Sequence, residues 1–136
     1  MGFIPEDITS GDINNDGIDD AVIADSFSFT VSVILSDGQG GFGSSVYYPG
    51  GIGPVSVGLA DFDGDGSLDI AEAVVGQAMV QVFPGRGGGT FGTAIGVGVT
   101  GFPQTPVLED FDNDGDIDMA VAGPLYISVV KNISNH

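Results

Sequence analysis

The chain repeats its own sequence at an interval of 49 residues. Three acidic segments begin at Asp12, Asp61 and Asp110, so each starts 49 residues after the one before it. The same interval superposes Phe42-Gly43 on Phe91-Gly92, which lie outside the acidic segments. A fixed period of this length is typical of repeat architectures, in which each unit buries its faces against its neighbours.

Local signals within a unit all favour β-strands. Short runs rich in Val, Ile and Phe are separated by Gly, Pro and Asn-Asp clusters, and no stretch keeps a helical apolar period for three turns. We therefore predict four strands in the second unit, at 54–62, 68–75, 78–85 and 91–99. Four-stranded antiparallel units of about 45 to 50 residues are typical of β-propeller blades.

The period predicts an all-β chain of about three propeller blades. Blade 1 is expected over about 5–53, blade 2 over about 54–102 and blade 3 over about 103–136, where the outer strand is lacking. Propeller rings contain about 4 to 8 blades, so this chain would close a ring only by oligomerisation or within a longer protein. We expect a homo-oligomer, with a dimer that closes a six-bladed ring as the simplest symmetric solution, or flanking blades in a longer chain.

The charge balance excludes several classes of partner. The formal net charge is -17, and a surface of this sign repels nucleic acids and anionic lipids. No apolar run approaches the roughly 18 residues that cross a membrane, and the N-terminus lacks the features of a signal peptide. We therefore expect no nucleic-acid binding, no membrane insertion and no signal peptide in this chain. Because 42% of the residues are hydrophobic, we also expect an ordered core rather than disorder.

The three acidic segments share the pattern D-x-[DN]-x-D-G-x-x-D and hold 13 of the 19 acidic residues. Alternate positions can aim their side chains at one point, and Gly at the sixth position permits the sharp turn that this requires. Ca²⁺ takes about 6 to 8 oxygen ligands in a forgiving geometry, whereas Mg²⁺ keeps its waters. Zn²⁺ is disfavoured because the chain has no Cys and a single, terminal His. We predict about three Ca²⁺ per chain; the alternative, merely solvated Asp-Gly turns, is weakened by the threefold recurrence.

Two other motifs receive structural interpretations. The second unit matches the EF-hand pattern with Glu72 at the twelfth position, but the flanking residues are strand-like, and Ile23 and Val121 hold that position in the other units. We therefore interpret Glu72 as an acidic side chain on a strand, with a solvent-facing orientation as one option. The G-x-G-x-x-G match at 38–43 is not followed by a helix, so we interpret it as a hairpin turn.

The Phe-Gly pairs, the lead-ins GGIGPVSV and TGFPQTPV, and the acidic loops together resemble the FG-GAP (VCBS-type) repeats of integrin α-subunit propellers and of many bacterial surface proteins. The resemblance implies calcium-binding blades with a metal loop between the first and second strands. It implies side-chain ligands at loop positions one, three, five and nine, which are Asp12, Asn14, Asp16 and Asp20; Asp61, Asp63, Asp65 and Asp69; and Asp110, Asp112, Asp114 and Asp118. The seventh residue of each loop (Ile18, Ser67 and Asp116) would supply a backbone carbonyl.

The expected function is a non-catalytic, calcium-binding propeller module for adhesion or for lectin-like recognition of a protein or glycan, located outside the cell or on its surface. Tyr47, Tyr48, Phe102 and Tyr126 could contact sugar rings, with packing against neighbouring strands as the alternative. Two other hypotheses remain. One is a propeller-based polysaccharide lyase or hydrolase, for which no acid and base cluster is evident, and the other is an isolated or engineered propeller fragment without a ligand of its own.

Overall fold

The computed structural model describes residues 4–131, and nearly all of its regular structure is β-strand. Two four-stranded sheets and one three-stranded sheet, all antiparallel, are present among the described residues, which confirms the prediction of an all-β chain with blade-like sheets. No helix in this part of the chain is long and apolar enough to cross a membrane. The elements are β1 (Pro5–Gly11), β2 (Asp20–Asp25), β3 (Thr30–Ile34), β4 (Val46–Pro49), β5 (Pro54–Ala60), β6 (Asp69–Val74), the 3₁₀ turn η1 (Val75–Gln77), β7 (Met79–Phe83), β8 (Ile95–Gly98), β9 (Pro106–Glu109), β10 (Asp118–Ala122) and β11 (Ile127–Val130).

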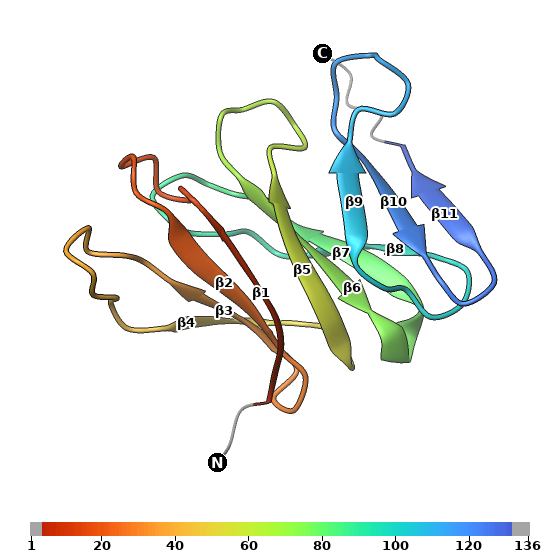
Figure 1. Ribbon diagram of the computed structural model, residues 1–136, viewed down its shortest axis with the longest axis horizontal. Helices are drawn as coiled ribbons and strands as arrows, with labels where there is room; N and C mark the ends of the chain where they lie inside the picture. The colour runs from red at the N-terminus through yellow and green to blue at the C-terminus, as the bar shows by residue number, and fades with distance from the viewer. Residues whose placement is uncertain (1–3, 132–136) are drawn as a thin grey trace.

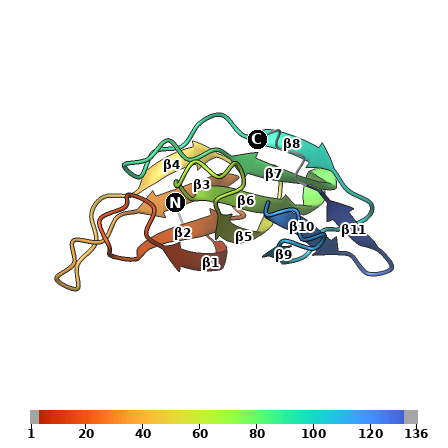
Figure 2. The same ribbon diagram turned by 90° about the horizontal axis from the view of Figure 1, so that it is seen from above.

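The three sheets lie side by side in chain order (Figure 1). We call them blade 1 (β1–β4), blade 2 (β5–β8) and blade 3 (β9–β11). Within each blade the strands are hydrogen-bonded in sequential order, so every connection is a hairpin. Seen from above, β1, β5 and β9 line one edge of the molecule, and β4 and β8 line the opposite edge (Figure 2). This is the arrangement expected of neighbouring propeller blades.

The fourth strand of blade 2 is shorter than the sequence predicted. It covers Ile95–Gly98 rather than 91–99, because Phe91 makes only an isolated bridge to Gly85. The backbone N–H of Phe91 donates instead to the hydroxyl of Tyr48 on blade 1, at 3.3 Å. Contact with the neighbouring blade therefore replaces regular sheet pairing at this position.

Successive side chains along each strand point to opposite faces of the blade. We call the face toward the preceding blade the leading face and the opposite one the trailing face. The leading face of blade 2 packs on the trailing face of blade 1 in a buried apolar core formed by Val57, Ile70, Phe83 and Phe91 on blade 2 and Val22, Ala24, Val31 and Val33 on blade 1. Removal of this apolar surface from water stabilises the junction.

The second junction is built in the same way from smaller residues. Ala71 and Val80 on the trailing face of blade 2 pack against Met119 and Val121 on the leading face of blade 3. Gly58 permits close approach, since a Cβ there would stand 2.9 Å from Cδ1 of Leu108. The Leu108 side chain of blade 3 therefore occupies the space that a side chain at position 58 of blade 2 would fill.

The structure corrects the solvent-facing option for Glu72. Its side chain is 0% exposed and lies on the leading face of blade 2. The Oε2 atom accepts hydrogen bonds from the Gly51 N–H at 3.2 Å and from the Gln81 amide, whereas Oε1 has no hydrogen-bond partner among the described residues. The physical reason is the Gly50–Gly51 connection from blade 1, which covers this carboxylate so closely that a Cβ on Gly50 would stand 2.5 Å from Oε1.

Candidate metal centres

The three acidic loops connect the first and second strands of the three blades. They are loop 1 (residues 12–20), loop 2 (61–69) and loop 3 (110–118). All three project from the same side of the molecule, at the upper edge in Figure 1. The fold thus repeats one local structure at three places on one rim.

Each loop is folded around its first carboxylate. In loop 2, Asp61 Oδ1 accepts from the Asp65 N–H at 3.2 Å, and Oδ2 accepts from the Gly66 N–H at 2.9 Å. Asp12 and Asp110 make the same pair of hydrogen bonds in the other loops. In all three loops the fifth-position carboxylate also accepts the N–H of the seventh residue. Backbone donors therefore hold the acidic side chains inside the curl of the loop.

Two backbone positions in each loop adopt the left-handed conformation. The sixth residue has φ values of 85°, 90° and 95° at Gly17, Gly66 and Gly115, as the sequence predicted. The fourth residue is also left-handed, with φ values of 61°, 74° and 60°. Sequence analysis missed this second position, although its signal was present, because the residues there are Asn15, Gly64 and Asn113, the types that tolerate φ above zero.

Loop 2 brings three carboxylates together. One oxygen from each of Asp61, Asp63 and Asp65 lies within 4.8 Å of the others. Two oxygens that bind one Ca²⁺ at about 2.3–2.6 Å can be at most about 5 Å apart, so this spacing fits a shared hard cation. The donor set contains only oxygen, which suits Ca²⁺ and Mg²⁺ better than Zn²⁺.

Loop 3 also gathers three carboxylates, from Asp110, Asp112 and Asp118. Here a basic side chain is present: Lys131 Nζ lies 3.0 Å from Asp112 Oδ2. The hydrogen bond from Lys131 lowers the pKa of the Asp112 carboxyl below its usual value. Asp114, the expected fifth-position ligand, accepts the N–H of Asp116 and is not in the close group.

Loop 1 has the weakest set of anionic donors. Asn14 replaces the third-position carboxylate, and its amide nitrogen donates to Asp16 Oδ2 at 2.9 Å. Among the described residues, the groups of three or more converging acidic side chains are in loops 2 and 3. The structure therefore supports two acidic clusters that could hold metal ions, and the third site stays a prediction.

The ninth-position aspartates have a second role. Asp20, Asp69 and Asp118 are 1%, 2% and 0% exposed. Asp69 accepts the Phe62 N–H at 2.8 Å and the Gly85 N–H at 2.6 Å, and Asp20 accepts the corresponding pair from Ile13 and Ser36. Burial raises the pKa of Asp69, and the hydrogen bonds from Gly85 and Phe62 oppose that rise. Each of these two carboxylates thus fastens the acidic loop to the turn after the third strand of the same blade.

The seventh-position residues lie within their loops. The N–H groups of Ile18, Ser67 and Asp116 donate to the fifth-position carboxylates at 2.9, 2.7 and 2.9 Å. Asp116 is 8% exposed, so its own carboxylate is largely withdrawn from solvent. The role of the three backbone carbonyls as ligands stays a prediction.

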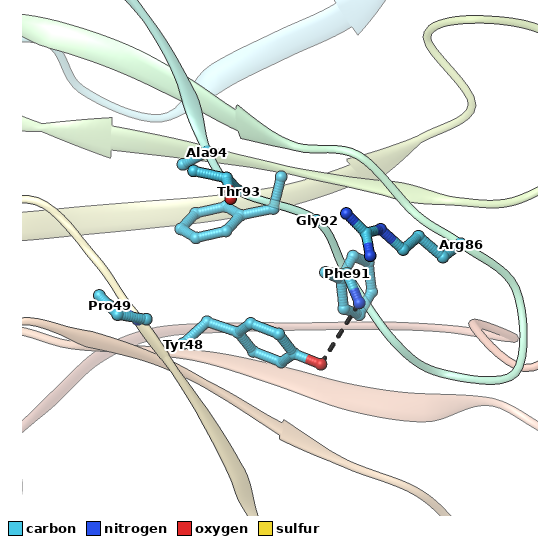
Figure 3. Close-up of a pocket in the computed structure, with 8 residues that line it drawn as sticks. Tyr48, Pro49, Arg86, Phe91, Gly92, Thr93 and Ala94 are labelled. Carbon is cyan, nitrogen blue, oxygen red and sulfur yellow. Dashed lines mark hydrogen bonds between the residues drawn. The ribbon is translucent and has the colours of Figure 1, made fainter.

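A pocket of about 370 Å³ lies at the junction of blades 1 and 2 (Figure 3). Blade 1 contributes Tyr48 and Pro49, and blade 2 contributes Phe83, Arg86 and residues 91–94. The rings of Tyr48 and Phe91 meet edge to face, with centroids 5.6 Å apart. Tyr48 therefore packs between blades, as the alternative in the sequence analysis held, and also lines a cavity wall.

Arg86 supplies a cation at this pocket. Its side chain lies over Gly92, where a Cβ would be 3.2 Å from Nε (Figure 3). Its guanidinium makes no hydrogen bond or ion pair within residues 4–131. In blade 1 the same repeat position is Asp37, which accepts the N–H groups of Gln39 and Gly41 and so closes its own turn. Sequence analysis did not single out Arg86, although it is the chain's one arginine and stands where the preceding repeat has an acid.

Comparison with known families gives a match to part of the chain. The model of the FG-GAP-like repeat family matches residues 12–71. This segment runs from the start of loop 1 into β6 and therefore contains loops 1 and 2. A search of curated proteins finds no match. The residue pattern, the blade-like sheets and the family match agree: over residues 12–71 this chain is an FG-GAP-like repeat.

Proposed function

We propose that the chain is a calcium-binding, non-catalytic recognition module in which Ca²⁺ stabilises the blades. The observation that carries this proposal is the convergence of Asp61, Asp63 and Asp65 within 4.8 Å. Three carboxylates at this separation repel one another, and a shared divalent cation relieves that repulsion. The net charge of -17 makes such relief valuable to the whole fold.

An extracellular or cell-surface location fits this role. Extracellular calcium modules typically have a Kd of about 10⁻⁴–10⁻³ M, which matches millimolar calcium outside the cell. Asp63 and Asp65 of loop 2 are exposed, so this site is open to calcium in the surrounding medium. The proposed site of action is therefore the calcium-rich medium at a cell surface.

Calorimetric titration of chelator-treated protein with Ca²⁺ tests the metal sites directly. We expect about three sites per chain, and Asp63→Asn should weaken the loop 2 site by about tenfold because it removes one anionic ligand. Asp19→Asn is the matched control: Asp19 is an exposed loop residue at the eighth position, so the same loss of charge should leave the affinities almost unchanged. Absence of any binding heat and of any calcium-dependent spectral change would refute the proposal.

Recognition of an acidic glycan is the second part of the proposal. It rests on the pocket in Figure 3, which combines aromatic walls with the guanidinium of Arg86, unpaired within residues 4–131. A sugar ring can pack on an aromatic face, and a planar guanidinium binds a carboxylate through two parallel hydrogen bonds. A pocket volume of about 370 Å³ lies within the range of small-ligand sites. The ligand class that this chemistry favours is a short uronic-acid-containing oligosaccharide. The overall charge of -17 opposes its binding at long range, and salt screens that repulsion, whereas the contact with Arg86 is local.

Saturation-transfer NMR with an oligogalacturonate and a neutral oligosaccharide tests this recognition in calcium buffer. Arg86→Gln should weaken oligogalacturonate binding by about tenfold, the effect of losing one charge-assisted contact. Lys131→Gln removes the other basic side chain, which lies at loop 3, and should not change this binding. Equal binding of the neutral sugar would count against the role of Arg86. Release of shortened or unsaturated sugars from the same mixture would favour the lyase or hydrolase alternative instead.

A further inference from the structure

Equivalent residues on the leading faces of blades 1 and 2 differ greatly in exposure. Phe91 is 7% exposed, whereas Phe42, one period earlier, is 61% exposed. Val57 is 4% exposed, whereas Ile8, again one period earlier, is 63% exposed. Blade 1 covers the leading face of blade 2, and within residues 4–131 no sheet covers the leading face of blade 1. The leading face of blade 1 thus has apolar residues at the positions that are buried between blades 1 and 2, but here they are exposed to solvent.

The trailing face of blade 3 shows the same contrast at the other end. Val80 of blade 2 is 2% exposed because blade 3 covers it, whereas Val129, one period later, is 52% exposed. Val107 is 53% exposed and Ile127 is 77% exposed on the same sheet. In blade 2 the equivalent trailing face packs against the leading face of blade 3.

We propose that a second copy of this chain covers both uncovered faces by head-to-tail pairing. The leading face of blade 1 in one copy packs on the trailing face of blade 3 in the other, and the reverse junction closes the pair. Both new junctions continue the blade-to-blade interface that the chain already contains twice. This proposal does not depend on calcium binding or on the glycan pocket.

The two uncovered faces are unlike each other, which favours head-to-tail pairing over face-to-face pairing. In the internal junction, Gly58 of blade 2 meets the large Leu108 of blade 3. At the proposed new junction, the blade 3 residue equivalent to Gly58 is Val107. The blade 1 residue equivalent to Leu108 is Ser10. In the internal junction the larger side chain is on the leading face, whereas in the proposed junction it is on the trailing face. A trailing face with Val107 therefore suits a leading face with the small Ser10. This complementarity identifies a copy of the same chain as the occupant.

The leading face adds little exposed charge to the new junction, whereas the trailing face carries one exposed carboxylate, Glu109, two residues after Val107 on β9. Ile8, Ile23 and Phe42 on the leading face are apolar, and Asp25 on that face is 4% exposed with hydrogen bonds from Ser32 and Thr30. Further opposition comes from the overall charge of -17 on each copy, which acts at long range and is screened by salt. Pairing should therefore be tighter at moderate salt than at low salt.

Light scattering coupled to gel filtration tests the pairing on the full chain in calcium buffer. We expect a mass of twice 13.7 kDa. Ile8→Asp on the leading face and Val129→Asp on the trailing face should each weaken self-association by about 100-fold, because each puts an unpaired charge into an apolar junction. Ile95→Asp is the matched control: Ile95 is 65% exposed on β8 of the middle blade, and the same change there should leave the mass doubled.

Mixing the two interface variants decides the geometry. The Ile8→Asp copy keeps an intact trailing face and the Val129→Asp copy keeps an intact leading face, so the mixture should form one heterodimer while neither variant pairs alone. A Val129→Asp variant that still forms a dimer alone would overturn head-to-tail pairing in favour of contact between leading faces. A wild-type chain that stays monomeric at all concentrations would overturn the proposal in favour of blades from another chain segment. A ladder of higher masses would overturn closure of the pair.

Discussion

Removal of calcium is expected to lower the melting temperature of the protein by more than about 10 °C. An ion that binds only the folded state stabilises it by about 2.7 kcal/mol per site at a hundredfold excess over Kd. For a chain of this length, 1 kcal/mol corresponds to roughly 4 °C. Loop 2 alone, with its three carboxylates within 4.8 Å, would therefore account for a shift of that size. Three bound ions would also bring the formal charge from -17 to about -11, with the relief at the loops.

Thermal unfolding followed by circular dichroism measures this effect, first in about 10 mM Ca²⁺, roughly a hundredfold above a Kd of about 10⁻⁴ M, and then in excess EDTA. Addition of calcium after chelation should restore the original transition. The Asp63→Asn variant should show a smaller calcium-dependent shift, whereas Asp19→Asn should keep the full one. Superimposable melting curves with and without calcium would show that the acidic loops need no ion.

Replacement of Glu72 by Gln is expected to stabilise the protein at neutral pH by about 1–2 kcal/mol, because the neutral amide removes the cost of burying an ionised carboxylate. Burial raises the pKa of the Glu72 carboxyl, and this outweighs the lowering effect of the hydrogen bonds from Gln81 and Gly51. A raised pKa means that the folded state binds the proton more tightly than the unfolded state does. Stability due to this group is therefore fully present below the unfolded pKa near 4.5 and is lost as the pH rises through the folded value.

The test compares free energies of unfolding by denaturant at pH 5 and pH 8. The gain from Glu72→Gln should be larger at pH 8, because the neutral amide removes only the cost of the ionised form. Asp19→Asn makes the same carboxylate-to-amide change at an exposed loop position and should alter the free energy by less than about 0.5 kcal/mol at either pH. Destabilisation by Glu72→Gln at both pH values would contradict the prediction. It would mean that the buried site stabilises the Glu72 carboxyl group better than it stabilises an amide.

The repeating features of the fold could be predicted from the sequence because they are local. The 49-residue period and the turn residues identify the blade-like sheets, and Gly17, Gly66 and Gly115 have the left-handed backbone that their loop position requires. Alternate carboxylates and a tight turn are close in the chain, so their convergence in loop 2 depends on few distant contacts. The family match over 12–71 covers loops 1 and 2, which contain two of these local signals.

Apart from the left-handed fourth residue of each acidic loop, the features that sequence analysis missed depend on contacts between distant segments. Glu72 looks like an exposed acid on a strand, and it is buried because Gly50 and Gly51 from the preceding blade lie over it. The predicted ligand Asp69 also accepts the N–H of Gly85, 16 residues later in the chain. Arg86 acquires its setting only when Tyr48 from blade 1 faces Phe91 from blade 2. Spacing within one segment cannot reveal which partner another segment will bring.

Asp69 couples loop 2 to the turn after β7, which carries Arg86. Its carboxylate reaches from loop 2 to the Gly85 N–H, and the next residue along the chain is Arg86. An ion that orders loop 2 would therefore also restrict the backbone from which the arginine extends. Coupling of this kind is reciprocal: whatever calcium does to the affinity for an anionic sugar, the sugar must do to the affinity for calcium.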